Sequence, residues 1–458
     1  MQIIIKKYIL AAIVLISLQF TACQQNNNVT TAMTGTAIQE EKNKETSKLE
    51  IPELLTRKGA IAELSEWDYV QKTVKELNEK IKRNPTDHKS SIYLALIYMQ
   101  EARITGEHPY YYPAALKILD HVIAQKPEKK QLHFQALVSQ ASVYLSQHEF
   151  EKALEVSKEA LVIEDYDAQV YGALCDANVE LGNYEEAVKM ADKMVSIRPD
   201  LRSYSRVSYL RELHGDYKGA IEAMKLAVSA GLPGDEATAW SRITLGDLYR
   251  NYGDVKNAEI EYKRTLQERP NYAFATAGLA KLEISKGNYT TAKKLLNEAA
   301  EVMPEFSFYE TLATVNQLEG NTNEVNKLNS DLIEMLQEDQ ESGHNMDLEL
   351  ANIYLTLDNN PEKALTYAER AYKERPDNIT VNQSMAKIYY KKGDFEAAAK
   401  HIDKALQTNF KDPELLCLAG LVKHKIGAKT DGISLMQQSM ALNPQMNNEW
   451  TKEAKAIL

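Results

Sequence analysis

The sequence is poor in cysteine, in tryptophan and in excess positive charge. Its 458 residues include 3 cysteines and 3 tryptophans, and 54 lysines and arginines stand against 65 acidic residues, for a formal net charge of −11. Three cysteines are too few for a disulfide scaffold or a cysteine-rich zinc protein. An acidic chain lacks the basic face that phosphate neutralisation requires, so we expect no nucleic-acid partner.

Motifs for catalysis are also missing. The 9 histidines are scattered without a His-x-x-x-His pair, and neither Gly-x-Ser-x-Gly nor Gly-x-x-x-x-Gly-Lys-Ser/Thr occurs. These three patterns would hold zinc, present a serine nucleophile and cradle phosphates, respectively. Paired acids such as Glu185-Glu186 are typical of the solvated first turn of a helix. We therefore expect no enzyme, no metal and no cofactor.

The chain begins with a segment that differs from all the rest. Residues 1–22 carry two lysines and no acid, followed by an apolar run that would span only ~20 Å as a helix, short of the ~30 Å hydrocarbon core. This pattern is typical of a signal peptide. It ends in Phe20-Thr-Ala-Cys23, which resembles a bacterial lipobox, although Phe20 stands where leucine is usual. The resemblance implies cleavage before Cys23 and lipidation of its sulfur; the alternative is a secretory signal with a chance cysteine.

A polar segment separates Cys23 from the first apolar pattern. Residues 23–49 are rich in Gln, Asn, Thr, Lys and Glu, the composition of a flexible tether. Acyl chains at Cys23 would anchor the chain to a membrane without spanning it. Because Gln24 is not aspartate, the simple inner-membrane retention signal of lipoproteins is absent, so the resemblance favours the outer membrane of a bacterial cell envelope.

A Gly-x-aromatic-x-x-Ala phrase recurs through the remaining chain. Copies begin at Gly182, Gly215, Gly287 and Gly393, and related turns such as Gly253 keep intervals of 33 to 38 residues. Repeats of this length indicate a solenoid of small helical units. Glycine at a turn, small residues where helices cross and proline after the second helix resemble the tetratricopeptide repeat (TPR), a 34-residue pair of antiparallel helices.

This resemblance implies an all-α fold, a right-handed α-solenoid superhelix of about ten TPR helix-turn-helix units with a C-terminal capping helix. Within it we predict an enlarged loop at residues 104–113 and a hinge at residues 337–343. The predicted domains are a lipoprotein signal peptide at 1–22, a flexible tether at 23–49, N-terminal helices forming a degenerate half-repeat at 50–86, the TPR array at 87–444 and the capping helix at 445–458.

In TPR proteins the first helix of each unit lines a concave groove, which implies a partner-binding surface here. For each residue that maps to this groove, the alternative to partner binding is that its side chain is simply solvated or packs against the neighbouring repeat. Tyr110, Tyr111 and Tyr112 form a second candidate patch, with packing against the first helix pair as the alternative. We expect Cys175 and Cys417, about seven units apart, to be packed thiols. The predicted groove residues are Arg202, Tyr209, Trp240, Asp247, Arg250, Phe274, Lys281, Asn352, Lys387 and Tyr390.

These observations favour a membrane-anchored TPR scaffold or adaptor that binds protein or peptide partners in its groove. Envelope assembly, secretion and recruitment of cell-wall enzymes are the processes such a protein would serve. The alternative is a polysaccharide-related factor whose tyrosine and tryptophan side chains bind glycan, or which takes part in its export.

Overall fold

The computed structural model of the protein describes residues 49–458. The chain divides into two units, Met1–Glu50 and Ile51–Leu458, and every helix of the described residues lies in the second. The predicted signal peptide and the predicted lipidation site, Cys23, lie outside the described residues. Within residues 49–458, no helix combines the length and the apolar content needed to cross a membrane.

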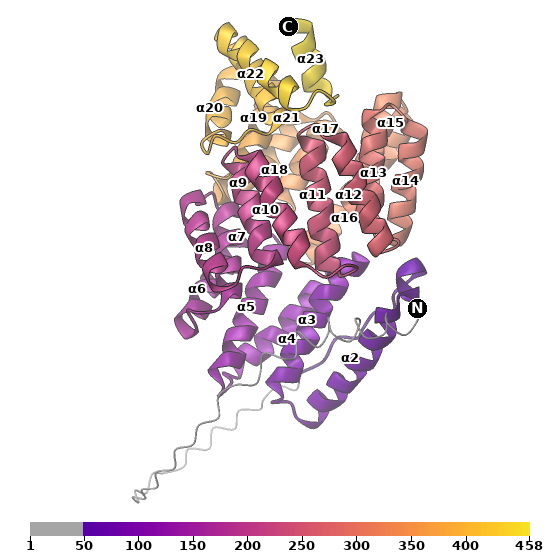
Figure 1. The fold of residues 1–458 in the computed structure, drawn as a ribbon, viewed down its shortest axis with the longest axis vertical. Helices are drawn as coiled ribbons and strands as arrows, with labels where there is room; N and C mark the ends of the chain where they lie inside the picture. Colours follow the sequence, from indigo (N-terminus) through magenta and orange to yellow (C-terminus); the bar gives the residue numbers. More distant parts are fainter. Residues whose placement is uncertain (1–48) are drawn as a thin grey trace, which may run out of the picture. The chain divides into compact units, whose positions relative to one another are not determined.

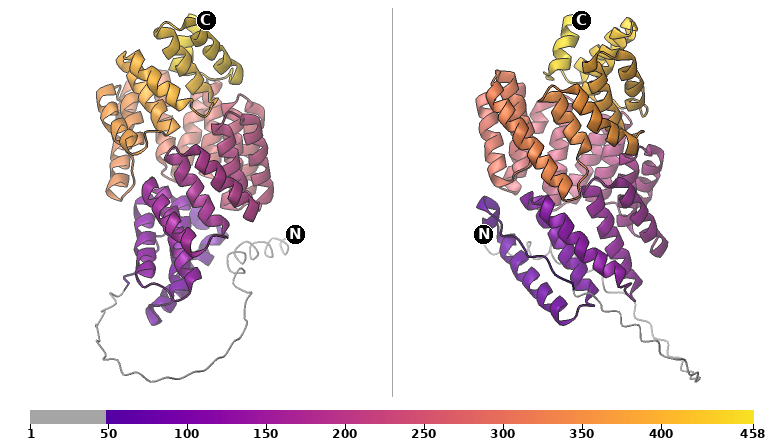
Figure 2. Two further views of the ribbon diagram at one scale, coloured as in Figure 1. Left: turned by 90° about the vertical axis from the view of Figure 1, so that its left-hand side faces the viewer. Right: turned by 180° about the vertical axis from the view of Figure 1, so that it is seen from behind.

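Residues 51–458 form one 3-10 helix and 22 α-helices, and the described part of the chain contains no β-strand. Figures 1 and 2 show the helices winding from α2 at one end of this unit to α23 at the other. The elements are η1 (Gly59–Glu63), α2 (Ser65–Arg83), α3 (His88–Thr105), α4 (His108–Ala124), α5 (Lys130–Ser146), α6 (Phe150–Ile163), α7 (Ala168–Glu180), α8 (Tyr184–Ile197), α9 (Leu201–Leu213), α10 (Tyr217–Ala230), α11 (Glu236–Asn251), α12 (Val255–Glu268), α13 (Ala273–Ser285), α14 (Tyr289–Val302), α15 (Phe306–Glu319), α16 (Thr322–Glu341), α17 (Asp347–Thr356), α18 (Pro361–Glu374), α19 (Ile379–Lys392), α20 (Phe395–Ala405), α21 (Pro413–Lys425), α22 (Lys429–Leu442) and α23 (Glu449–Ile457).

Ten consecutive helix pairs make up the array, from α3 with α4 to α21 with α22. We call the first helix of each pair helix A and the second helix B. Each helix packs on its partner and on the next pair along the chain, which buries the apolar residues of a unit that has no core of its own. The predicted all-α solenoid of about ten units is confirmed.

The turn between helices A and B follows from its local sequence. Gly182 and Gly393 both adopt φ 80°, a left-handed conformation that glycine enters without strain and that ends helix A. The next residue caps helix B where it is aspartate: Asp216 accepts a hydrogen bond from the backbone N–H of Gly219, and Asp254 accepts one from that of Asn257. Such a cap typically contributes ~1 kcal/mol to helix stability.

Small residues allow neighbouring helices to approach. Tyr262 of α12 is fully buried, and its ring packs against two glycines on different A helices. A Cβ atom added to Gly246 of α11 would lie 2.5 Å from that ring, and one added to Gly278 of α13 would lie 2.7 Å from it. One tyrosine therefore fixes the distance between two successive units.

Two local predictions are wrong. The residues from 104 to 113 do not form an enlarged loop, because α3 ends at the left-handed Gly106 and α4 already begins at His108. Pro109 is compatible with this early start, since the first turn of a helix needs no N–H at that position. The predicted hinge at 337–343 is mostly helical, because α16 continues to Glu341 over a buried apolar face.

Successive turns of the superhelix touch one another. At four places a carbonyl group at the C-terminal end of an A helix accepts a hydrogen bond from a loop that follows a B helix and lies 192 to 198 residues later, about six repeats along the chain. We call these four contacts the seam. They are Asn345 N to Gln147 O at 2.9 Å, Asn378 Nδ2 to Glu180 O at 2.9 Å, Thr408 Oγ1 to Leu213 O at 2.5 Å and Asn443 Nδ2 to Asn251 O at 3.0 Å.

Both cysteines of the array are buried free thiols, as expected. The superhelix nevertheless brings Cys175 of α7 and Cys417 of α21 into a single apolar cluster, although they are far apart in sequence. At the C-terminal end, α23 covers the last pair: Trp450 is 5% exposed, and its ring meets that of Tyr390 edge to face at 5.4 Å.

Candidate binding site on the inner face

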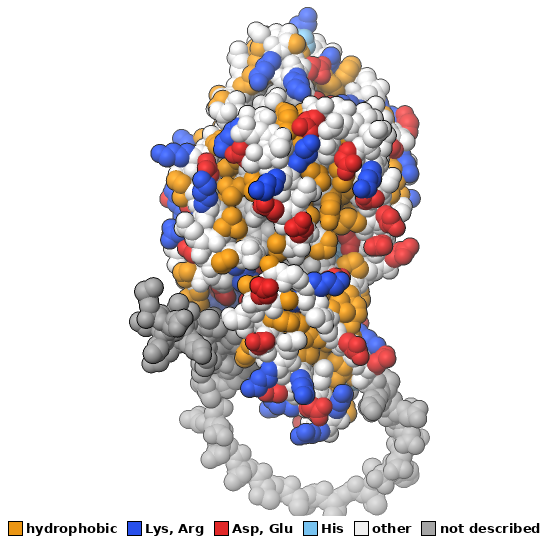
Figure 3. All heavy atoms as spheres, turned by 90° about the vertical axis from the view of Figure 1, so that its right-hand side faces the viewer, with side chains coloured by type: hydrophobic (Ala, Val, Ile, Leu, Met, Phe, Trp, Pro, Cys, Tyr) orange, Lys and Arg blue, Asp and Glu red, His pale blue; other side chains and the backbone are white. Residues whose placement is uncertain are grey.

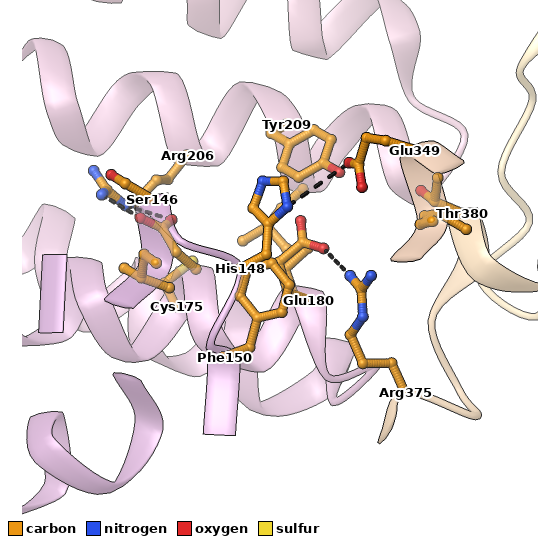
Figure 4. Close-up of a pocket in the computed structure, with 15 residues that line it drawn as sticks. Ser146, His148, Phe150, Cys175, Glu180, Arg206, Tyr209, Glu349, Arg375 and Thr380 are labelled. Carbon is orange, nitrogen blue, oxygen red and sulfur yellow. Dashed lines mark hydrogen bonds and ion pairs between the residues drawn. The ribbon is translucent and has the colours of Figure 1, made fainter. Parts of the chain in front are cut away.

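A cavity of about 490 Å³ lies where the two turns of the superhelix meet, a volume within the range of ligand sites. Helices α5, α7 and α9 supply one wall, and α17, α19 and the end of α18 supply the other. Figure 4 shows the stacked rings of His148 and Phe150 near the middle, with Arg206 on one side and Arg375 on the other. We call the inner face the surface formed by the A-helix positions that line this cavity together with the corresponding positions of the other A helices, such as Trp240 of α11, which corresponds to Thr380 of α19.

Two arginines on the cavity wall are held by carboxylates. The guanidinium of Arg206 donates to both oxygens of Asp176, at 2.8 and 2.5 Å, and also contacts the carbonyl oxygen of Gly172. Arg375 reaches across from the second turn and donates to Oε2 of Glu180 at 3.1 Å. This second ion pair joins the two turns of the superhelix, so one wall of the cavity is also part of their contact.

Glu349 has no such partner. The imidazole of His148 lies beside it, with Nδ1 3.7 Å from Oε1 of Glu349 and 3.1 Å from the carbonyl oxygen of Asn345. Its Oε2 atom is buried without a hydrogen bond among the described residues. Glu349 in turn helps to raise the pKa of Glu180, for which burial is the main cause and Arg375 the main opposing influence.

The cavity is enclosed but accessible to water. Tyr209 has 43% of its surface exposed to solvent. Its hydroxyl nevertheless lies among protein groups, and this burial raises its pKa well above the ordinary value. Burial also raises the pKa of the Cys175 thiol on the same wall to about 12, so this thiol is protonated at neutral pH and is a poor nucleophile. Within residues 49–458, no group of three or more His, Cys, Asp or Glu side chains could hold a metal ion.

Three of the predicted groove residues lie on accessible parts of the A helices. Tyr209 lines the cavity, Trp240 is 49% exposed and Arg202 is exposed. The indole of Trp240 meets the ring of Phe274 edge to face at 5.2 Å, and Phe274 meets Phe308 in the same way at 5.3 Å. These aromatic residues follow one another at intervals of 34, so they form a row along α11, α13 and α15.

Other predicted groove residues are tied into polar contacts. Asp247 accepts a hydrogen bond from the Tyr262 hydroxyl at 2.7 Å and lies 3.3 Å from Arg250. Lys387 pairs with Glu414 at 2.5 Å in the following unit. Asn352 accepts a hydrogen bond from Ser384 at 2.9 Å. Burial lowers the pKa of Lys281. Among the described residues, no carboxylate oxygen lies within 4.0 Å of its ammonium group.

Two predictions about tyrosines need correction. Tyr390 is only 8% exposed, and its hydroxyl donates to Glu453 of α23 at 2.7 Å, so it supports the capping helix and does not line a groove. Tyr110 donates to the carbonyl oxygen of Glu53, and the buried Tyr111 accepts a hydrogen bond from the backbone N–H of Leu55, so both pack the N-terminal segment. Tyr112 is buried against His108 and His344, and the three tyrosines therefore offer no separate binding patch.

The sequence reasoning missed all five of the Asp, Glu and Arg residues that line the cavity, which are Asp176, Glu180, Arg206, Glu349 and Arg375. Arg206 was detectable only through its neighbour Arg202, which maps to a groove position and lies one helical turn earlier on the same face of α9. Glu180, Glu349 and Arg375 were not detectable as a group. Arg375 follows a B helix, and its distance from Glu180 depends on how far each repeat rotates relative to the last.

Family models described as tetratricopeptide repeat match residues 168–201 and residues 335–419. Together with the ten helix pairs, these matches show that the chain contains TPR repeats. A TPR array is an interaction scaffold that is typically non-catalytic.

Two curated proteins are similar to part of the array. The human protein O-mannosyl-transferase TMTC1 is 23% identical over 186 residues, which are 40% of this chain and 21% of that protein. Cellulose synthase 1 operon protein C of Komagataeibacter xylinus is 27% identical over 149 residues, 30% of this chain and 11% of that protein. Among solved structures, the human IFIT1 dimer with PPP-AAAA has a TM-score of 0.44 at 14% identity, covering 82% of this chain and 88% of that one.

Proposed function

We propose that the protein is a lipid-anchored scaffold of the bacterial cell envelope whose inner face binds an extended segment of a protein partner. The observation that carries the proposal is the composition of that face: Trp240 of α11 and Tyr209 of α9 are 49% and 43% exposed, whereas the other large apolar residues of these two helices are buried or half-buried. Aromatic side chains of this kind are common anchors of interfaces, because they offer contact area at little cost in conformational entropy.

The polar groups of the inner face suit a peptide. Main-chain N–H and C=O groups of an extended segment need donors and acceptors at many positions, and the cavity offers guanidinium, carboxylate and hydroxyl groups between apolar walls. The outer surface supplies a contrast. Figure 3 shows Lys and Arg interspersed with Asp and Glu on the face that it draws, without a continuous basic field of the kind that nucleic acid requires.

The binding proposal is tested by cross-linking in the native cell, partner identification and capture by purified variants. Replacing Trp240 by alanine and Arg250 by glutamine together should reduce capture, since an aromatic anchor and a charge are lost. Tyr166→Ala is the matched control, because Tyr166 is an aromatic residue that is 70% exposed and lies in the loop between α6 and α7, not on an A helix. Equal capture by both variants would refute binding at the inner face.

The anchor is part of the same proposal and is tested separately. The anchor is supported by the lipobox-like sequence Phe20-Thr-Ala-Cys23, which follows an apolar run. The residue after Cys23 is Gln24 and not aspartate, which favours the outer membrane. The wild-type chain should take up a fatty-acid analogue and fractionate with outer membranes, whereas Cys23→Ala should do neither. A Cys23→Ala chain that still carried label would show that Cys23 is not the acylated residue.

A second candidate function is glycan binding for polysaccharide synthesis or export. It is favoured by the exposed ring of Trp240 at the end of an aromatic row that continues into the core through Phe274 and Phe308, since sugar rings stack on exposed aromatic faces, and by similarity to a relative named for a cellulose synthase operon. A glycan array probed with the wild-type chain and Trp240→Ala separates the two candidates. Saccharide binding that Trp240→Ala abolishes would favour glycan over peptide.

A further inference from the structure

The charged side chains of the cavity wall do not balance. The wall carries three carboxylates, those of Asp176, Glu180 and Glu349, against the two guanidinium groups of Arg206 and Arg375. Arg206 is paired with Asp176 through two hydrogen bonds, and Arg375 is paired with Glu180. Both guanidinium groups are therefore already matched, and the negative charge of Glu349 is left over.

The carboxylate of Glu349 receives no hydrogen bond from the described residues. Its Oε2 atom is buried without a partner, and its Oε1 atom lies 3.7 Å from Nδ1 of His148, which is beyond hydrogen-bond distance. That nitrogen lies 3.1 Å from the carbonyl oxygen of Asn345. Because a carbonyl oxygen only accepts, the hydrogen on Nδ1 is used for Asn345. A carboxylate without a donor is uncommon at such a site and indicates a bound group.

Only one oxygen of this carboxylate is open to the cavity. The Glu349 side chain is 23% exposed and Oε2 belongs to its buried part, so Oε1 is the atom that a ligand can reach. Figure 4 shows this end of the side chain directed toward His148. Apolar side chains, Leu145, Val179 and Leu210 among them, line the same cavity. A ligand group that fits this wall carries a positive charge on an apolar stem.

We infer that the cavity binds the ammonium group of a lysine side chain of the partner segment, with Glu349 as its counter-ion. An ammonium group is a compact cation that can bind a single carboxylate oxygen, and its alkyl stem packs on apolar surface. A guanidinium group binds best through paired hydrogen bonds to both oxygens of a carboxylate, and the burial of Oε2 does not allow that arrangement. The inference rests on the proposed binding at the inner face and adds the side chain that this part of the face selects.

Two features of the folded chain favour such a ligand. Folding has already removed water from Oε2 of Glu349, so this part of the desolvation cost is not added when the ligand binds. Glu349 also acts on the neighbouring carboxylate of Glu180, whose pKa it helps to raise. A cation held at Glu349 offsets this repulsion between the two carboxylates.

The test compares short peptides that differ only at their central residue, which is lysine, norleucine, arginine or glutamate between flanking alanines. Their ends are acetylated and amidated, so that the central side chain carries the only charge. Ligand-observed nuclear magnetic resonance titrations measure their affinities for the full chain. We expect the lysine peptide to bind about tenfold more tightly than the norleucine peptide, because only lysine forms a charge-assisted hydrogen bond with Glu349. The arginine peptide should lie between them, and the glutamate peptide should bind most weakly.

Glu349→Gln keeps the shape of the side chain and removes its charge, so it should bind the lysine and norleucine peptides equally. Glu222→Gln is the matched control, because it removes the same charge from an exposed position on the B helix α10. This control should keep the tenfold preference for lysine. Urea unfolding checks that both variants are folded, and Glu349→Gln should be at least as stable as the wild type, since it loses a carboxylate that has no donor.

The inference would be overturned by equal affinities of the wild type for the lysine and norleucine peptides, or by the absence of binding of the lysine peptide. A preference for lysine that survives in Glu349→Gln would overturn it as well. An arginine peptide that binds as tightly as the lysine peptide would contradict the choice of ammonium over guanidinium. Partner capture by the paired Trp240 and Arg250 substitutions reports on the proposed function, and its outcome is independent of the peptide series.

Discussion

Glu212 of α9 is expected to make the stability of the array depend on pH. Its carboxyl group is half-buried, and its pKa is raised to about 7, first by burial and then by the nearby Asp412 at the start of α21 and by Asp247. The native chain therefore holds this proton more tightly than the unfolded chain does. Its contribution to stability falls as the pH rises from about 4.5 to about 7, because in that window the native state binds more protons.

The magnitude follows from the shift. A change from the ordinary value of 4.5 to about 7 corresponds to ~3 kcal/mol at pH values above both. Glu212→Gln keeps the size of the side chain and removes the charge. We expect the variant to be more stable than the wild type by ~1–3 kcal/mol near pH 8 and nearly equal to it near pH 5.

Urea unfolding, followed by far-ultraviolet circular dichroism at both pH values, measures this difference through the shift of the midpoint. Glu222→Gln is the control, because Glu222 is an exposed residue of the next helix paired with Lys225 at 2.7 Å. Its midpoint should follow that of the wild type at both pH values. A Glu212→Gln midpoint that differs from the wild type by the same amount near pH 5 and near pH 8 would refute the reasoning.

Three further substitutions probe other parts of the array. Arg57→Ala leaves the fully buried carboxylate of Glu101 without its 2.6 Å ion pair, which should cost ~3–5 kcal/mol and raise hydrogen exchange in α2 and α3. Gly278→Ala forces a methyl group against the Tyr262 ring and should cost ~1–3 kcal/mol, measured by urea unfolding. Burial lowers the pKa of His344 to about 4, so stability is lost as the pH falls from about 6.5 to about 4; His344→Gln should lose less over that window in thermal unfolding.

The ten helix pairs were predictable because each is encoded within one repeat and its neighbour. Glycine at 182 or 393 and aspartate at 216 act on their own turn, and Gly246 with Gly278 acts on the adjacent helix. Such contacts can be predicted from one repeat and its neighbour, without knowing the geometry of the whole superhelix. The extra residues before Pro113 were misread for a related reason: counting residues between two repeat positions does not tell whether a loop or two longer helices contain them.

The cavity was not predictable in the same way. The ion pair between Glu180 and Arg375 joins residues that are 195 apart, and it forms only because small rotations between successive repeats add up to a full turn. The error at Tyr390 has a similar origin. Its place in the repeat matches a groove position, but the array ends nearby and α23 covers it.

The seam also limits how this array can evolve. In an open solenoid, duplication or loss of one repeat changes only the length, because each unit meets just its neighbours. Here a unit inserted between α9 and α18 would carry the later loops past their partners, so that Asn378 would no longer face Glu180 and Thr408 would no longer face Leu213. The number of repeats in one superhelical turn is thereby held constant, and the first unit is held in the same way by the contacts of α4 with α16 and of η1 with α14.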